Sequence, residues 1–312
     1  MRFGAHLPLI DFDGRGWRPG ELGSYVDVAR QLRYDAVGVN DHLVFQRPWL
    51  DGIVALASVI ERSGDMRLAT TVALPVVRGA AALAKAAAAL DILSGGRLVL
   101  GVGPGSSARD YALAGLDFDE RWPRLDDAIR AIRAHLGGAS AYEKDGGASA
   151  YEKGLVLQPA PVRLAGPPIW IGSWGSEAGM RRVARLGDGW LASAYNASPA
   201  QVAEARARLG VALERAGKRL DGFECALATM WIYVTDSGSE RDERLSALGR
   251  MLNRPAEQLR ERVLVGPAAE CAATLRAYAE AGIDQVFVWP LADPHDQLER
   301  LMRDVVPLAV RP

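Results

Sequence analysis

The chain has 312 residues, with 37 basic and 38 acidic side chains and therefore a formal net charge of −1. This balance gives no electrostatic reason to expect nucleic acid or an anionic membrane surface as a partner. Only two cysteines occur, far apart in the sequence, which argues against a disulfide framework and favours a reducing compartment. The sequence shows neither a signal peptide nor an apolar stretch long enough to span a bilayer, and so predicts a soluble, cytoplasmic protein.

Strands and helices are expected to alternate along the whole chain. Apolar runs bounded by turn residues predict eight strands, at 2–7, 35–40, 67–74, 97–102, 168–172, 189–192, 223–234 and 284–289. Helical periodicity predicts helices at 19–33, 49–63, 79–93, 121–136, 176–186, 199–216, 268–281 and from about 295. This alternation predicts an α/β fold, a single (β/α)8 TIM barrel over residues 1–312. An open doubly wound sheet is the alternative; the strand count and the lack of a GxGxxG turn after the first strand disfavour it.

The segment 137–166 interrupts the alternation, between the predicted fourth helix and fifth strand. It contains a nine-residue tandem duplication, GGASAYEKD at 137–145 and GGASAYEKG at 146–154. Two copies are too few for a solenoid, and loop-closure entropy grows slowly enough for a surface loop to accommodate them. The segment is interpreted either as a surface loop without function or as a lid over the barrel mouth.

One stretch, residues 90–107, joins a helix end, a buried strand and a glycine-rich loop. Ser94-Gly95-Gly96 ends the helix, because glycine accepts the left-handed conformation of a C-terminal cap. The apolar run 97–102 follows, and Gly103-Pro104-Gly105 then leaves bare backbone N–H groups at the carboxyl end of the strand. Proteins of the α/β class bind their ligands at such strand ends, so this loop is a candidate binding element.

Residues that follow the strands of a barrel share one end, and this end holds the active site. In this chain they are mostly aromatic, hydroxyl-bearing or glycine residues, with two histidines and one carboxylate: His6, Asn40, Asp41, His42, Thr70–Val72, Gly103–Ser107, Ser173–Gly175, Ser193, Trp231 and Trp289. A metal would need three or four His, Asp, Glu or Cys ligands, which this set cannot supply. The set suits a planar organic ligand, uncharged or anionic.

His42 is the candidate catalytic residue, because histidine carries protons near neutral pH and this one follows a predicted strand end. A purely structural hydrogen bond is the alternative. His6, Trp231 and Trp289 are the candidate substrate-pocket residues. The tryptophans Trp174, Trp231 and Trp289 are interpreted as a stacking wall at the barrel rim, with packing in the core as the alternative. For His6, packing, stacking against the cofactor and catalysis are the alternatives.

The run Gly172-Ser173-Trp174-Gly175-Ser176 leads from a predicted strand into a helix. A helix N-terminus offers free N–H donors and the positive end of the helix dipole, which favour a phosphate group. An N-cap formed by Ser173 or Ser176, with no ligand, is the alternative.

These features together resemble the luciferase-like family, TIM-barrel oxidoreductases that use FMN or the deazaflavin F420. The resemblance covers nearly the whole chain and rests on six segments: VNDH at 39–42, LATTV at 68–72, LDILSGGRLVLGVGPG at 90–105, PPIWIGSWG at 167–175, RLGDGW at 185–190 and YAEAGIDQVFV at 278–288.

The resemblance implies a role for each matching residue. His42, paired with Asp41, contacts the cofactor ring and acts in proton transfer in several members. Thr71-Val72 matches a bulge, often a non-proline cis peptide, that supports the ring from behind. The loop that contains Gly103, Gly105 and Ser106 borders the polar edge of the ring. The run from Gly172 to Ser176 holds the cofactor phosphate.

One position departs from the family pattern. In the F420-dependent sugar-phosphate dehydrogenases of the family, a glutamate follows the strand-four glycine loop and acts as an acid. This chain has Ser106 at that position. The departure argues against a sugar-phosphate substrate and leaves His42 as the only expected proton carrier.

The Asp-His pair and the short, uninterrupted barrel resemble the F420 branch more than the FMN branch. The resemblance therefore implies an enzyme that transfers hydride between F420 and a small organic substrate. An FMN-dependent monooxygenase that uses reduced flavin and O2 is one alternative, and a non-catalytic flavin-binding protein is another. A homodimer, and a flavin or F420 reductase that supplies the reductant, are further expectations.

Overall fold

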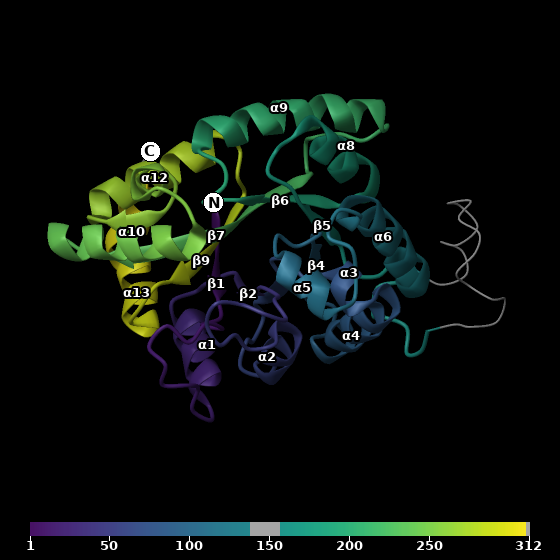
Figure 1. Ribbon diagram of the computed structural model, residues 1–312, viewed down its shortest axis with the longest axis horizontal. Coiled ribbons are helices and arrows are strands. Elements are labelled where there is room, and N and C mark those ends of the chain that lie inside the picture. Colours follow the sequence, from purple (N-terminus) through teal and green to yellow (C-terminus); the bar gives the residue numbers. More distant parts are fainter. Residues whose placement is uncertain (138–156, 310–312) are drawn as a thin grey trace.

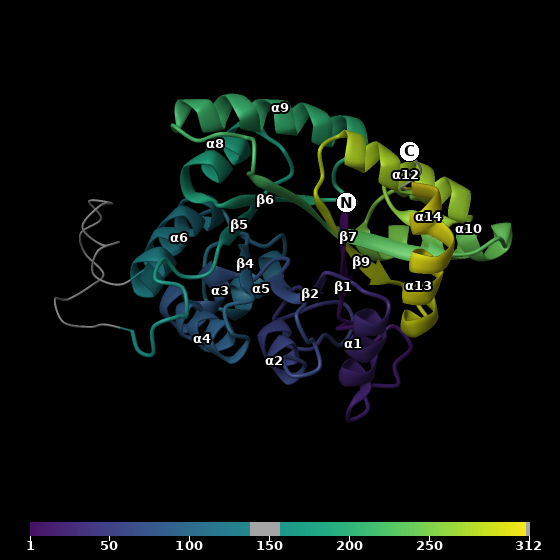
Figure 2. The same ribbon diagram turned by 180° about the vertical axis from the view of Figure 1, so that it is seen from behind.

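The computed structural model describes residues 1–137 and 157–309, which form a closed barrel of parallel strands surrounded by helices (Figures 1 and 2). The barrel strands are β1 (Arg2–His6), β2 (Ala36–Val39), β3 (Arg67–Thr70), β4 (Leu98–Val102), β5 (Ile169–Gly172), β6 (Gly189–Ser193), β7 (Glu224–Val234) and β9 (Gln285–Pro290). Neighbouring strands pair in parallel, and the pairing of β6 with β7 closes the ring. The predicted TIM barrel is confirmed.

Eight helices lie close to their predicted positions: α1 (Glu21–Gln31), α2 (Gly52–Ser58), α4 (Ala80–Leu93), α6 (Arg121–Gly137), α8 (Glu177–Leu186), α9 (Pro199–Arg215), α12 (Ala268–Glu280) and α13 (Pro294–Arg300). A π-helical turn (Leu301–Val305) and α14 (Val306–Ala309) continue α13. No helix within the described ranges is both long and apolar enough to cross a membrane.

Five short or polar elements were not expected: α3 (Pro75–Arg78), α5 (Ala108–Leu113), α10 (Gly238–Leu252), α11 (Ala256–Arg260) and β8 (Leu264–Gly266). The strand β8 has three residues, too few to show a periodicity, and it pairs with the far end of β7 outside the barrel ring. The helices α10 and α11 lie between β7 and β8, in a stretch for which the sequence analysis predicts no element.

Two large aromatic side chains fill the barrel interior. Trp170 of β5 and Phe287 of β9 are each 1% exposed, and small residues on other strands make room for them. A Cβ atom on Gly38 would lie 2.7 Å from the Phe287 ring, and a Cβ atom on Gly189 would lie 2.3 Å from the Trp170 ring. Glycine at these two positions therefore permits the aromatic filling that keeps the barrel closed.

The described part of the predicted insertion, residues 157–166, lies at the amino-terminal end of the strands. Asp91 at the end of α4 accepts hydrogen bonds from the backbone N–H of Val162 (3.0 Å) and from Arg163 (2.7 Å). Arg163 also donates to the carbonyl of Leu98, the first residue of β4 (2.5 Å). This part of the segment therefore does not cover the barrel mouth, which lies at the opposite strand ends. Residues 138–156, which hold almost all of the tandem duplication, lie outside the described residues.

Phe287→Ala is expected to lower the free energy of unfolding by about 3–5 kcal/mol, because it opens a cavity among residues that cannot collapse around it. Urea denaturation followed by circular dichroism measures the change. Leu113→Ala is the control, since this side chain is 65% exposed, and should change stability by about 0.5 kcal/mol or less. Similar changes in both variants would contradict the assignment of Phe287 to the barrel core.

Candidate active site

A pocket of about 230 Å³ opens at the carboxyl ends of the barrel strands. Nearly all of the predicted cofactor-site residues line it, together with the predicted catalytic histidine: Asp41, His42, Thr71, Val72, Gly103, Gly105, Ser106, Gly172, Ser173 and Trp174. The remaining two, Gly175 and Ser176, follow directly at the amino-terminal end of α8. The strand ends thus bring together residues that lie far apart in the sequence.

The strand β3 ends at Thr70, and the next residues turn into the pocket. The peptide bond between Thr71 and Val72 is cis, which confirms what the resemblance implied. A Cβ atom on Gly103 would lie 2.9 Å from the Val72 side chain, and one on Gly172 would lie 3.0 Å from it. Glycine at the ends of β4 and β5 therefore makes room for Val72, which packs above the barrel interior as part of the pocket wall.

His42 is held by a residue that the sequence analysis missed, Asp110 of α5. The Nδ1 atom of His42 lies 2.8 Å from Oδ2 of Asp110, and the Asp110 side chain is 1% exposed. The other carboxylate oxygen accepts hydrogen bonds from the backbone N–H groups of Leu43 (3.0 Å) and Val44 (2.8 Å). Burial alone would raise the pKa of Asp110, but the hydrogen bonds from His42 and from these two N–H groups outweigh it and lower the pKa.

The ionised carboxylate fixes how His42 presents itself. Nδ1–H donates to Asp110, so Nε2 is the ring nitrogen left to a ligand. Trp49 and Phe45 pack around the imidazole, with ring centroids 4.7 Å and 5.2 Å away. A histidine held in one tautomer and one orientation at the edge of a pocket can give or accept a proton there.

Asp41, the partner of His42 in sequence, is buried and saturated by protein donors. Arg78 donates to both of its oxygens, at 2.6 Å and 2.7 Å, and the backbone N–H of Leu74 donates to Oδ2 at 3.0 Å. Asp41 thus ties the loop after β2 to the chain after β3, and its carboxylate is occupied within the protein.

The loop between β5 and α8 offers free backbone donors. The N–H groups of Trp174, Ser176 and Glu177 have no acceptor within the described residues. Ser176 caps α8 by accepting from the N–H of Gly179 (3.1 Å), so the predicted N-cap is present as well. The indole N–H of Trp190 donates to the carbonyl of Ser173 (3.0 Å) and holds the loop in place. Free N–H groups at a helix N-terminus are suited to a phosphate group.

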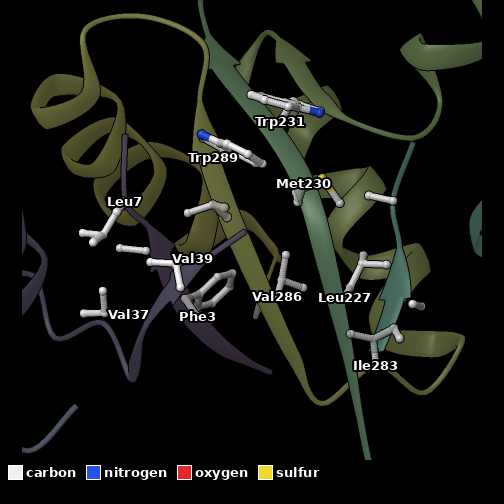
Figure 3. Close-up of a cluster of buried hydrophobic side chains, with 14 of the residues drawn as sticks. Phe3, Leu7, Val37, Val39, Leu227, Met230, Trp231, Ile283, Val286 and Trp289 are labelled. Atoms are coloured by element: carbon white, nitrogen blue, oxygen red, sulfur yellow. The ribbon is translucent and has the colours of Figure 1, made fainter. Parts of the chain in front are cut away.

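Of the predicted stacking wall, Trp174 lines this pocket, whereas Trp231 and Trp289 do not, and neither does His6. His6, Trp289 and Trp231 are all buried, and Trp289 stacks between the other two, with centroids 3.6 Å from His6 and 4.2 Å from Trp231. Figure 3 shows the Trp289 and Trp231 rings side by side, reaching from β9 and β7. The rings cover one another and do not line the pocket, so Trp231 and Trp289 pack in the core, which is the alternative interpretation of these tryptophans, and His6 is buried against Trp289.

His6 differs from His42 in its chemistry. Burial lowers the pKa of His6 to about 4, although its hydrogen bond with the carbonyl of Leu7 opposes the shift. Its Nδ1–H donates to that carbonyl at 2.8 Å, and the imidazole is neutral at physiological pH. His6 therefore does not supply a proton in the way that His42 can.

Several residues that line the pocket were not expected from the sequence: Leu74, Phe118, Arg121, Trp122, Leu191, Ala192, Tyr195, Asn196, Ala228 and Thr229. Arg121 is the only cationic side chain on the pocket lining within the described residues, and it lies over the ring of Phe118 at 4.0 Å. Phe118, Arg121 and Trp122 lie between β4 and β5 in the chain, where only a helix was predicted. No group of three or more His, Cys, Asp or Glu in the described ranges could hold a metal ion.

Comparisons with known proteins identify the family of this chain. The profile of a family described as luciferase-like monooxygenase matches residues 11–248. An F420-dependent glucose-6-phosphate dehydrogenase of Amycolatopsis mediterranei is 27% identical over 318 residues, which cover 93% of this chain and 94% of the relative.

Solved structures share the fold. The monooxygenase RslO1 from Streptomyces bottropensis superimposes with a TM-score of 0.83 at 20% identity, covering 98% of this chain and 99% of that one. An F420-dependent secondary alcohol dehydrogenase, solved with an F420-acetone adduct, superimposes with a TM-score of 0.79 at 17% identity, covering 99% of both chains. With a family profile matched over most of its length and this pocket at the barrel mouth, the chain belongs to the luciferase-like monooxygenase family, and it is an oxidoreductase.

Proposed function

We propose that this oxidoreductase transfers hydride between F420 and a small organic substrate bound at the barrel mouth. The observation that carries the proposal is the His42–Asp110 pair, which presents one imidazole nitrogen at the edge of a pocket whose other side carries free N–H donors. The names of the relatives favour F420, since both the dehydrogenase of Amycolatopsis mediterranei and the secondary alcohol dehydrogenase are called F420-dependent.

The residues present fit such a cofactor. The free N–H groups of Trp174, Ser176 and Glu177 would hold its phosphate, and Val72 would support its ring from one side. F420, when bound, carries hydride equivalents. The protein itself contributes position and proton transfer: Asp110 orients the imidazole, and Nε2 of His42 gives or accepts the proton that accompanies hydride.

The pocket has no carboxylic acid at the position after the strand-four loop, where Ser106 lies on the lining. Asp41 is occupied by Arg78, so His42 is the proton carrier that we assign. A homodimer, a reductase partner and a cytoplasmic location stay predictions of the sequence.

Anaerobic fluorescence titration of the purified protein with F420 and, separately, with FMN tests the cofactor. We expect F420 to bind more tightly than FMN. Tight binding of FMN alone would overturn the proposal in favour of an oxygen-dependent monooxygenase, the function in the name of RslO1. Oxygen uptake in the presence of reduced FMN would then be the next measurement.

A charge at the α8 N-terminus tests where the phosphate lies. Ser176→Asp keeps the helix cap but places a negative charge beside the free N–H groups, and should weaken F420 binding by about tenfold or more at low salt. Ser237→Asp is the matched control, because Ser237 caps α10 in the same way, by accepting from the N–H of Glu240. Equal affinities of the two variants would place the phosphate elsewhere.

His42→Ala should retain F420 binding and lower turnover by roughly 10²–10⁴, the usual contribution of a general acid–base residue. Turnover equal to that of the unmodified enzyme would remove His42 from the mechanism. Stopped-flow measurement of the hydride-transfer step, once a substrate is in hand, separates this effect from product release.

Asp110→Asn should lower turnover mainly through His42, because Asp110 positions the imidazole and does not line the pocket. The double variant His42→Ala/Asp110→Asn should then be no slower than His42→Ala. A further loss in the double variant would show that Asp110 acts by another route, such as general support of the pocket.

A further inference from the structure

One side of the pocket, formed by the ends of β6 and β7, carries a continuous chain of hydrogen bonds. Arg254 donates to the amide oxygen of Asn196 (2.9 Å), and the amide nitrogen of Asn196 donates to Oγ of Ser193 (2.9 Å). Ser193 and Thr229 share a hydrogen bond between their hydroxyl oxygens (2.8 Å), and Thr229 donates to the carbonyl of Ala228 (2.7 Å). Asn196, Ser193 and Thr229 line the pocket, and we call these three residues the polar wall.

The backbone of β7 is shaped to place the hydroxyl of Thr229. Thr229 has φ of +57°, a left-handed conformation that β-branched residues rarely adopt. The pairing of β7 with β9 shifts register between Leu227 and Met230, so a β-bulge lies at this point. Bulges and left-handed non-glycine residues recur beside functional sites, where they redirect a side chain.

The donor and the acceptor of each hydrogen bond in this series follow from the groups at its two ends. Arginine has donors only, so the amide oxygen of Asn196 faces Arg254 and its nitrogen faces Ser193. The Thr229 hydroxyl donates to the Ala228 carbonyl, an acceptor, so the shared proton between the two hydroxyls belongs to Ser193. Both hydroxyl protons of the wall are therefore used inside the protein, and each hydroxyl oxygen keeps a lone pair.

Each hydroxyl oxygen of the wall keeps a lone pair, so these two positions favour groups that donate a hydrogen bond. An alcohol O–H or an amide N–H can donate to these oxygens, whereas carboxylates and phosphates have only acceptors and would leave the lone pairs unpaired. The neighbouring phenol of Tyr195 stays uncharged, because burial raises its pKa. The Arg254 guanidinium that reaches this wall donates to Asn196.

We propose that the polar wall binds an uncharged, hydrogen-bond-donating group of the substrate, an alcohol or a primary amide, and discriminates against carboxylates and phosphates. This inference rests on the proposed function and specifies its substrate class. Arg254 is a positioning residue. It comes from the turn between α10 and α11, a part of the chain that also contacts the loop after β2 through Gln46 and the carbonyl of Met251 (3.3 Å).

Three probes of similar shape test the polar wall: benzyl alcohol, benzamide and benzoate. Their binding is followed by calorimetry, with and without bound F420. We expect benzyl alcohol and benzamide to bind more tightly than benzoate. Ser193→Ala should weaken these two probes by about three- to tenfold, the effect of one neutral hydrogen bond, and leave F420 affinity unchanged.

Arg254→Leu frees the amide of Asn196 and should reduce the discrimination between benzyl alcohol and benzoate, whereas Arg254→Lys, which keeps a donor, should restore it. Arg219→Gln is the control, since Arg219 is exposed and its ion pair is with exposed Asp221. Thermal unfolding of each variant checks that the fold is intact.

Tighter binding of benzoate than of benzyl alcohol, probe binding that Ser193→Ala leaves unchanged, or binding of none of the three probes would overturn the inference. A failure of the proposed function is distinguishable from a failure of this inference, because it would show as a lack of F420 binding in the titration. Probes that bind and respond to Ser193→Ala in a protein that does not bind F420 would support the wall and reject the cofactor.

Discussion

The Asp110 carboxylate connects the two loops on which the pocket depends. One of its oxygens binds His42, and the other accepts from the backbone of Leu43 and Val44, so a single side chain of α5 fixes both the ring and the loop that carries it. A charged acceptor is suited to this task, since hydrogen bonds to an ionised group are shorter and stronger than neutral ones. Because the Asp110 carboxylate is buried, each of its oxygens needs a hydrogen-bond donor, and each has one.

A second carboxylate follows the same principle on the other side of the loop. Asp41 is saturated by Arg78 and by the backbone of Leu74, which joins the chain after β2 to the chain after β3. The two residues of the Asp-His pair therefore have different surroundings, because Asp41 supports the loop and His42 presents Nε2 at the pocket edge. Adjacent residues in one motif thus have different partners: Asp41 binds Arg78, and His42 binds Asp110.

Close packing sets the shape of the pocket, and hydrogen bonding sets its polarity. Val72 lies where glycine at the ends of β4 and β5 leaves space, whereas the aromatic stack of His6, Trp289 and Trp231 packs into the core. The polar wall lies at the ends of β6 and β7 and consists of neutral groups. Its hydroxyl protons donate to acceptors within the protein. The pocket thus combines one imidazole held by a carboxylate, at His42, with apolar and neutral polar surfaces.

Local residue patterns were enough to predict the barrel, the alternation of its strands and helices, and about half of the residues that line the pocket. Apolar runs and helical periodicity are local properties, and strand ends in a barrel converge on one face, so His42, Val72, Gly103 and Ser173 could be placed together without coordinates. The family segments added the cis peptide at Thr71-Val72, which the structure contains.

The packing of distant elements, by contrast, sets which side chains turn toward the pocket and which hydrogen-bond partners they have. Side chains alternate in direction along a strand, and the β7 bulge changes that alternation, so the sequence could not tell that Trp231 turns into the core while Thr229 lines the pocket. His42 and Asp110 are 68 positions apart, and Asn196 and Arg254 are 58 apart. Hydrogen bonds across such distances depend on how whole elements pack, and no local pattern of residues records them.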